Sequence, residues 1–276
     1  MNRLKAALIQ MPVVEDKQTN LEVAGDYIRQ AADQGADLVV LPEMFNCPYA
    51  SVNFPVYAEA EGGASHAYLS EAARDNSVYL VAGSIPERDA QGRIFNTSFV
   101  FDRAGRQIGR HRKMHLFDIE VEGGQCFKES DTLAPGQEVT VFETEFGKIG
   151  LAICYDLRFP ELARLMTDDG AKILVIPAAF NMTTGPAHWE VLFRNRALDN
   201  QVYILGVAPA RNPNGVYVSY GNSLVVSPWG DVVSRLDDQP GMLVTEIDLD
   251  YVDKVRRELP LLQHRRKDLY TLSKRF

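Results

Sequence analysis

Residues 147–160 read GKIGLAICYDLRFP, and the prediction of the fold starts from this stretch. Residues 148–153 form a short β-branched and aliphatic run, which is typical of a buried strand. Cys154 follows at once, a polar cluster comes next, and Phe159-Pro160 opens a helix-like segment. A thiol at the carboxyl end of a buried strand lies where α/β folds place their ligand sites. The turn that follows can also aim backbone N–H groups at an anion.

A free cysteine in such a place has a second interpretation. Free cysteines are usually small apolar residues of the protein core. Cys154 taken alone fits that role better than a catalytic one, so the rest of the chain has to decide whether its thiol is reactive.

Strands and helices alternate in two waves around this stretch. Strands at residues 4–11 and 36–41 enclose a helix that Asn20 could cap, which predicts a parallel βαβ unit. Residues 96–102 and 106–113 predict a hairpin, and residues 122–137 predict a loop. Further strands are predicted at residues 78–84, 139–143, 173–177, 202–208, 222–227, 232–236 and 242–247, with helices at 65–74, 159–169, 187–200 and 249–258.

This alternation predicts the architecture of the whole chain. No linker, low-complexity segment or internal repeat divides it, so we expect a single domain over residues 1–276. The two waves of strands and helices predict an α/β fold in which two mixed sheets lie back to back with helices outside. Such a fold is a four-layer α-β-β-α sandwich.

Composition and charge argue against several classes of function. The chain has 276 residues, a net charge of −8 and a pI near 5.2, which argues against nucleic acid or an anionic membrane as the main partner. Its cysteines, Cys47, Cys126 and Cys154, form no CxxC pair, so Cys47 and Cys126 are interpreted as structural thiols in a reducing compartment. No apolar stretch approaches the ~18 residues of a membrane helix, and no signal-peptide pattern is present. We expect a cytoplasmic protein.

Three predicted strands end at reactive side chains. Glu43 follows LVVLP, Lys113 follows RHR, and Cys154 follows LAI. Acyl transfer uses all three types, because a thiol attacks as thiolate, a nearby carboxylate can take its proton, and an ammonium can stabilise an oxyanion. Separately, Glu43 could cap a helix and Lys113 could be a solvated charge of the hairpin. The three residues alone therefore leave both interpretations open.

The sequence around these residues resembles the signature blocks of the nitrilase superfamily of carbon–nitrogen hydrolases. The blocks are LVVLPEMF around Glu43, GRHRKMHLFD around Lys113 and GLAICYDLRFPEL around Cys154, and their order and spacing agree as well. The resemblance covers about residues 4–270. It implies the α-β-β-α sandwich and a Glu-Lys-Cys triad that needs neither a metal nor an organic cofactor. It also implies a second glutamate, which FKESDTLAPG places at Glu129, where it would orient Lys113 and the substrate amide.

The resemblance also bears on assembly. Members of this family associate through a face beside the catalytic sheet, which implies a homodimer or a larger homo-oligomer. The basic tail, residues 259–276, would take part in subunit contacts through Arg265, Arg266 and Tyr270. The expected partners are a small-molecule amide substrate that carries a carboxylate and further copies of the chain, with neither nucleic acid nor a membrane.

Further blocks resemble the omega-amidase branch of the superfamily. They are PEMFNCPYA, HLFDIEV, AFNMTTGPAHWE and RNRALDNQVY, which begin at residues 42, 115, 179 and 194. This branch hydrolyses the terminal amide of α-ketoglutaramate and α-ketosuccinamate to the dicarboxylate and ammonia. Its substrates carry a carboxylate at the far end, so the pocket needs a fixed cation.

Arg158 matches the position that binds this carboxylate in relatives, and a planar guanidinium suits a bidentate contact. The structural alternative for Arg158 is an ion pair with Asp156 or Glu161. Phe180 and Thr184 match pocket-lining positions in the same resemblance.

The mechanism that the resemblance implies has two halves. Glu43 takes the proton of Cys154, and the thiolate attacks the amide carbonyl while Lys113 and the Tyr155 backbone N–H stabilise the oxyanion. Ammonia leaves and a thioester forms. Glu43 then activates the water that releases the dicarboxylate.

Other functions account for fewer of these residues. A papain-type hydrolase needs a histidine base such as His188, but the local signature around the cysteine is missing. His111 and His115 alone suggest a metal amidohydrolase, and they lie in a predicted strand and turn without an HExxH motif. A scaffold without activity is expected to have lost a triad residue. The nearer alternatives are activities that share the triad. They are deaminated glutathione amidase, N-carbamoyl amino acid or other aliphatic amide hydrolase, and nitrilase.

Overall fold

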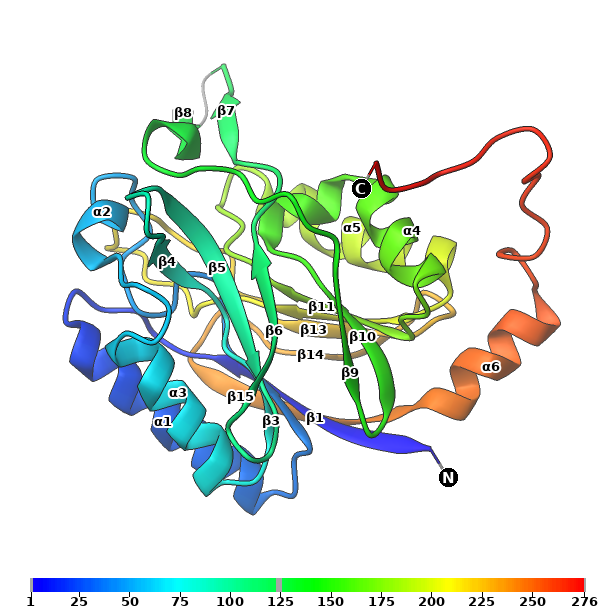
Figure 1. The fold of residues 1–276 in the computed structure, drawn as a ribbon, viewed down its shortest axis with the longest axis horizontal. Coiled ribbons are helices and arrows are strands. Elements are labelled where there is room, and N and C mark those ends of the chain that lie inside the picture. The colour runs from blue at the N-terminus through cyan, green and yellow to red at the C-terminus, as the bar shows by residue number, and fades with distance from the viewer. Residues whose placement is uncertain (1, 123–125, 276) are drawn as a thin grey trace.

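The computed structural model describes residues 2–122 and 126–275. Two β-sheets lie at the centre of the molecule (Figure 1). The first has seven strands in the order β15-β1-β2-β3-β5-β4, and β6 also pairs with β5. Its strands are β1 (Arg3–Gln10), β2 (Leu38–Val40), β3 (Tyr79–Val81), β4 (Ile85–Arg88), β5 (Ile94–Phe101), β6 (Gln107–Arg112) and β15 (Gly241–Asp248).

The second sheet has six strands in the order β14-β13-β12-β11-β10-β9. Three central strands, β10 to β12, run parallel because helices α4 (Pro160–Asp168) and α5 (Gly185–Asn200) return the chain to the same end. A two-stranded ribbon follows β6 and consists of β7 (Asp118–Glu120) and β8 (Cys126–Lys128). The strands of the second sheet are β9 (Thr140–Thr144), β10 (Gly147–Leu151), β11 (Ile173–Pro177), β12 (Tyr203–Val207), β13 (Leu224–Val226) and β14 (Val232–Arg235).

Each sheet buries apolar side chains on both faces. In β1, Ala6 and Leu8 join an apolar layer that also contains residues of the second sheet, whereas Ala7 and Ile9 pack with helices α1 (Lys17–Asp33) and α3 (Ala64–Asp75). Strand β11 divides its side chains in the same way between this inner layer and helices α4 and α5. The alternation follows the period of two of a β-strand.

The layers therefore follow the order helix, sheet, sheet, helix. Figure 1 shows α1 and α3 on one side of the sheets and α4 and α5 on the other. The short helix α2 (Phe54–Tyr57) lies in the segment between β2 and α3, and α6 (Leu249–Glu258) follows β15. The predicted four-layer α-β-β-α sandwich is confirmed.

Some local predictions are wrong. Helix α1 begins at Lys17, and the carboxylate of Asp16 caps it by accepting a hydrogen bond from the Thr19 backbone N–H. Asn20 lies inside the helix, where its side chain bonds to the backbone of Val14 instead. Strand β4 was not predicted. The predicted loop at residues 122–137 contains β8 and the 3-10 turn η1 (Glu129–Asp131), while residues 123–125 lie outside the described residues.

The chain after α6 returns to the end of α4. Arg265 pairs with both carboxylate oxygens of Asp168, at 2.6 and 2.8 Å, and Lys274 contacts Asp169. Figure 1 shows this segment as a long excursion that ends beside α4. Tyr270 is exposed on it.

Candidate active site

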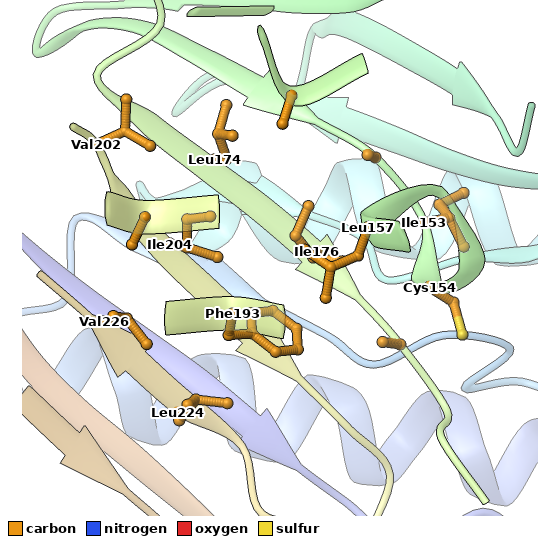
Figure 2. Packing of buried hydrophobic residues seen from close by; sticks show 14 of the residues in the cluster. Ile153, Cys154, Leu157, Leu174, Ile176, Phe193, Val202, Ile204, Leu224 and Val226 are labelled. Atoms are coloured by element: carbon orange, nitrogen blue, oxygen red, sulfur yellow. The ribbon is translucent and has the colours of Figure 1, made fainter. Parts of the chain in front are cut away.

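Cys154 lies in the turn between β10 and α4. The chain leaves β10 and passes through a 3-10 turn, η2 (Cys154–Arg158), before α4 begins. Cys154 has a φ of +47°, a left-handed conformation that non-glycine residues rarely adopt outside turns and functional sites. It is only 6% exposed. Figure 2 shows Cys154 at the margin of the apolar cluster in which Ile153 and Leu157 anchor the turn.

Lys113, Glu43 and Glu129 form a buried charged cluster. Lys113 Nζ lies 3.0 Å from Glu43 Oε1 and 2.9 Å from Glu129 Oε1, and all three side chains are 0% exposed. Lys113 directly follows β6, Glu43 lies in the turn after β2, and Glu129 opens η1. The structure thus brings together three of the predicted catalytic residues from separate parts of the sequence.

The Cys154 thiol is a neighbour of the Glu43 carboxylate, and each side chain shifts the pKa of the other. Glu43 Oε1 receives hydrogen bonds from Lys113 and Asn96, and the Tyr49 hydroxyl oxygen lies 3.2 Å from it. Glu43 Oε2 is buried and has no partner of ordinary hydrogen-bond geometry within the described ranges. This oxygen is therefore available for the thiol proton.

Burial and charge set the protonation of the cluster. Burial raises the pKa of the Cys154 thiol well above its usual value, and the Glu43 charge adds to this while Lys113 opposes it. Burial likewise raises the pKa of Glu43, against the attraction of Lys113. For Lys113, burial favours the neutral amine, but the charges of Glu129 and Glu43 outweigh it and raise the pKa of the ammonium. At neutral pH Lys113 stays charged, and the thiol keeps its proton until a base accepts it.

Sequence reasoning missed two residues of this cluster. The Tyr49 hydroxyl lies 2.5 Å from Glu129 Oε1 and 3.2 Å from Glu43 Oε1. Asn96 in β5 donates from Nδ2 to Glu43 Oε1 at 2.8 Å. Asn96 carried a signal, because an amide within an otherwise apolar buried strand needs a polar partner. Tyr49 carried none, since it lies in an irregular segment.

A small cavity beside Cys154 collects the four residues predicted to bind substrate. The cavity has a volume of about 10 Å³, enough for about one water molecule. The side chains around it come from η2, the segment after β11 and the ribbon region, because β10 and β11 end at the same edge of the sheet. Its lining residues are Phe117, Cys154, Tyr155, Arg158, Ala179, Phe180, Thr184 and Tyr217.

The Arg158 guanidinium packs against aromatic rings. Its central carbon lies 4.9 Å from the centre of the Phe180 ring and 5.6 Å from that of Tyr155, and Nη1 lies 3.1 Å from His188 Nδ1. Among the described residues Arg158 forms no ion pair, and its buried Nε has no hydrogen-bond partner. The structure therefore does not support the alternative of a structural ion pair, and the guanidinium can accept an anion.

A second, larger cavity adjoins the small one on the side of Glu43. Its volume is about 350 Å³, and Glu43 and Tyr49 line it. Ala179 and Tyr217 line both cavities. The Tyr217 hydroxyl donates to the Ala179 carbonyl, and its ring packs 4.6 Å from that of Tyr49. Ala179 and Tyr217 therefore form the partition between the two cavities.

The family described as carbon-nitrogen hydrolase matches residues 5–257. The chain belongs to this family. As a carbon–nitrogen hydrolase it is an enzyme. Its fold is also that of the family. The crystal structure of Saccharomyces cerevisiae Nit3, a member of branch 10 of the nitrilase superfamily, superimposes on it with a TM-score of 0.88. That structure is 40% identical, and the match covers 96% of this chain and 97% of the yeast chain.

Two further relatives of this carbon–nitrogen hydrolase are informative. A Mus musculus protein named omega-amidase NIT2 is 48% identical, over 99% of this chain and 99% of its own length. The structure of an amidase from Nesterenkonia sp. AN1 is 28% identical and superimposes with a TM-score of 0.81, over 96% of this chain and 95% of the other. In that structure, of the E41L mutant, the acetamide moiety of fluoroacetamide is added covalently at the active site cysteine.

Two histidines of the hydrolase share the buried carboxylate of Asp156, which lies in the same turn as Cys154. Asp156 Oδ2 lies 3.0 Å from His111 Nε2, and Asp156 Oδ1 lies 2.7 Å from His115 Nδ1. His115 also stacks on Phe159 with ring centres 3.7 Å apart. These contacts join the segment that carries Lys113 to the turn that carries the thiol.

Across residues 2–122 and 126–275, no helix combines the length and the apolar character that crossing a bilayer demands.

Proposed function

We propose that this enzyme is a cysteine-dependent omega-amidase. It hydrolyses the terminal amide of short dicarboxylic acid monoamides, α-ketoglutaramate and α-ketosuccinamate, to the dicarboxylate and ammonia through a thioester. The observation that carries the proposal is the buried cluster of Glu43, Lys113 and Glu129 beside Cys154, with the Arg158 guanidinium lining the same cavity as the thiol. The similarity to proteins named omega-amidase supports the choice of substrate.

Acylation begins with proton transfer from the thiol to Glu43. The burial that raises the pKa of the thiol makes this base necessary, and Glu43 Oε2 is free of other partners to serve as one. The thiolate attacks the amide carbonyl, and the charge that develops on its oxygen is stabilised by the Lys113 ammonium and the Tyr155 backbone N–H. Glu43 then gives the proton to the departing ammonia.

Deacylation reuses the same base. Water takes the place that ammonia left, Glu43 accepts a proton from it, and the thioester is hydrolysed to the free acid and thiol. Glu129 and Tyr49 do not exchange protons with the substrate in this scheme. They hold the Lys113 ammonium in place, with Nζ 2.9 Å from Glu129 and the Tyr49 hydroxyl 2.5 Å from the same oxygen.

The far carboxylate of the substrate pairs with Arg158. The acyl chain exceeds the 10 Å³ of the small cavity, so substrate binding displaces side chains that line it. Arg158 can follow the substrate because its contacts are to rings and to His188 rather than to an acid. Phe180 and Thr184, which line the same cavity, then contact the acyl chain.

The experiment measures formation of the free dicarboxylate from α-ketoglutaramate and from deaminated glutathione in parallel. The proposal expects strong preference for α-ketoglutaramate, and loss of turnover in Cys154→Ala. Cys126→Ala is the matched control, because Cys126 is an exposed thiol in β8. Preference for deaminated glutathione would keep the mechanism and change the substrate. Inactivity of the folded enzyme on both would show that the roles of Arg158, Phe180 and Thr184 are wrong.

We also infer that the enzyme works in the cytoplasm as a homodimer or larger homo-oligomer. All three cysteines are free thiols, which suits a reducing compartment. Residues 259–275 leave Leu269 and Tyr270 exposed on a segment that ion pairs fix to α4. Light scattering of the full chain and of Tyr270→Glu tests this, since the variant should shift the mass toward the monomer.

A further inference from the structure

The cavity on the side of Glu43 is larger than the departing ammonia requires. Its volume is about 350 Å³, within the range of small-molecule sites, which begins near 300 Å³. Ammonia is close in size to water, whose share of liquid volume is about 30 Å³. The residues that line the cavity are Val13, Val14, Glu15, Glu43, Met44, Cys47, Pro48, Tyr49, Ala179, Pro209, Ala210, Asn212, Asn214, Gly215, Val216, Tyr217 and Ser219.

The arrangement of the two cavities fixes the direction of a bound amide. Cys154 attacks the carbonyl carbon and Arg158 binds the far carboxylate, and both residues line the small cavity. Glu43 must reach the amide nitrogen to protonate it, and Glu43 lines the larger cavity. The acyl side of the scissile bond therefore faces the small cavity, and any substituent on the nitrogen points past Ala179 and Tyr217 into the larger one.

The lining of the larger cavity selects among substituents. Its walls include apolar side chains such as Val14, Met44 and Val216. Glu15 and Glu43 are its charged residues, and none of the described residues that line it is a lysine or an arginine. An apolar or cationic group can be accommodated there, whereas a carboxylate would meet like charge without a partner.

We propose that the larger cavity is a leaving-amine subsite, and that the enzyme hydrolyses N-substituted monoamides of short dicarboxylic acids when the amine is apolar or cationic. The proposal rests on the proposed omega-amidase function. It adds a class of secondary amides to the primary amides, and it disfavours deaminated glutathione, whose leaving cysteinylglycine carries a carboxylate.

The chemistry balances without a further reactant. The bond between Cys154 Sγ and the carbonyl carbon forms, and the bond between that carbon and the substituted nitrogen breaks. The thiol proton passes through Glu43 to the nitrogen, so that a neutral primary amine departs. Water then cleaves the thioester, and the acyl-enzyme is the same one that the primary amide produces.

The test compares amides that share one acyl chain. Glutaramate reports the proposed function, and N-butyl-, N-(2-aminoethyl)- and N-(carboxymethyl)glutaramate report the subsite through release of glutarate. We expect kcat/KM for the butyl and aminoethyl amides within about tenfold of glutaramate, and kcat/KM for the carboxymethyl amide at least about tenfold below the aminoethyl amide.

Two variants locate the subsite. Val216→Trp places a large ring at a residue that is 92% exposed and lines the cavity, so it should fold normally and lower the ratio of butyl amide to glutaramate turnover by about 10–100-fold. Val56→Trp is the matched control, since Val56 is 77% exposed and lies outside the lining. Glu15→Lys should shift the preference from the aminoethyl toward the carboxymethyl amide.

The outcomes separate the two proposals. No glutarate from glutaramate would reject the proposed function itself. Turnover of glutaramate with none of the butyl amide would reject the subsite alone. An equal loss for both amides in Val216→Trp would also reject it, because the cavity would then be the path by which every substrate reaches the thiol. Preference for the carboxymethyl amide or for deaminated glutathione would reject the charge argument.

Discussion

Asp156→Asn should destabilise the fold strongly, although Asp156 is not expected to touch substrate. The carboxylate is buried and accepts four hydrogen bonds. Oδ1 accepts from the His115 backbone N–H at 2.9 Å and from its Nδ1 at 2.7 Å, and Oδ2 accepts from His111 Nε2 at 3.0 Å and the Ile153 backbone N–H at 3.1 Å. An asparagine can accept with only one of its two end atoms. Its amide nitrogen must then face two donors.

The magnitude follows from these contacts. Hydrogen bonds to a charged group contribute about 1.5–3 kcal/mol each, and leaving a buried donor without an acceptor costs about 1–3 kcal/mol. We therefore expect Asp156→Asn to lower the free energy of unfolding by about 3–5 kcal/mol at pH 7. Because each kcal/mol shifts the melting temperature of a chain of this size by about 2–4 °C, the midpoint should fall by about 10 °C.

The effect should depend on pH in a defined direction. Burial works against the Asp156 carboxylate, but the hydrogen bonds of His111 and His115 outweigh it, and the pKa of Asp156 is lowered in the folded state. A lowered folded pKa contributes stability above the unfolded pKa of about 3.9, and this contribution disappears as the pH falls below it. The difference between wild type and Asp156→Asn should therefore shrink as the pH is lowered past 4.

Urea unfolding at several pH values measures this. Asp26→Asn is the matched control, because Asp26 is exposed and forms a surface ion pair with Arg29. His115→Asn keeps a donor near the position of Nδ1 and should retain most of the stability, whereas His115→Leu should not. A destabilisation of Asp156→Asn below about 1 kcal/mol, or one that does not change with pH, would refute the reasoning.

Three further substitutions test the site. Lys113→Met should lower kcat by at least about 10³-fold, because it removes the cation from between Glu43 and Glu129, and steady-state kinetics on α-ketoglutaramate would show it. Arg158→Met should raise KM for α-ketoglutaramate by about 30-fold or more while changing turnover of an uncharged aliphatic amide little; an equal effect on both would contradict the carboxylate contact. Tyr49→Phe removes the hydroxyl that bonds Glu129 and should lower kcat by about 10–100-fold with KM nearly constant, and an unchanged kcat would show that Lys113 needs no such support.

The sequence could predict the fold, and it could single out the candidate residues Glu43, Lys113 and Cys154, because their signals are local. The β-branched run before Cys154 and the apolar run before Glu43 mark two strand ends, and the hairpin pattern around residues 103–105 places Lys113 at the end of a third strand. Apolar periodicity likewise located α4, α5 and most strands. The helix start at Asp16 was missed because Asp16 and Asn20 are both good capping residues, and only the contact of Asn20 with Val14 separates them.

Other features depend on contacts between remote parts of the chain. Tyr49 lies in a segment without periodicity, and its place is set by packing against Tyr217. The pairing of Asp156 with His111 joins the turn η2, which follows β10 of the second sheet, to β6 of the first sheet, and no spacing along the sequence reveals it. The partition of the site into two cavities likewise depends on the loop that carries Tyr217.

The central claim is that Cys154 carries the acyl group. Rapid quenching of the enzyme with α-ketoglutaramate, followed by intact-mass and peptide analysis, measures this directly. The account predicts an added mass equal to the substrate acyl group, located on the peptide that contains Cys154 and absent from Cys154→Ala. Turnover that persists in Cys154→Ala, or an adduct on Cys47 or Cys126 in its place, would contradict the account.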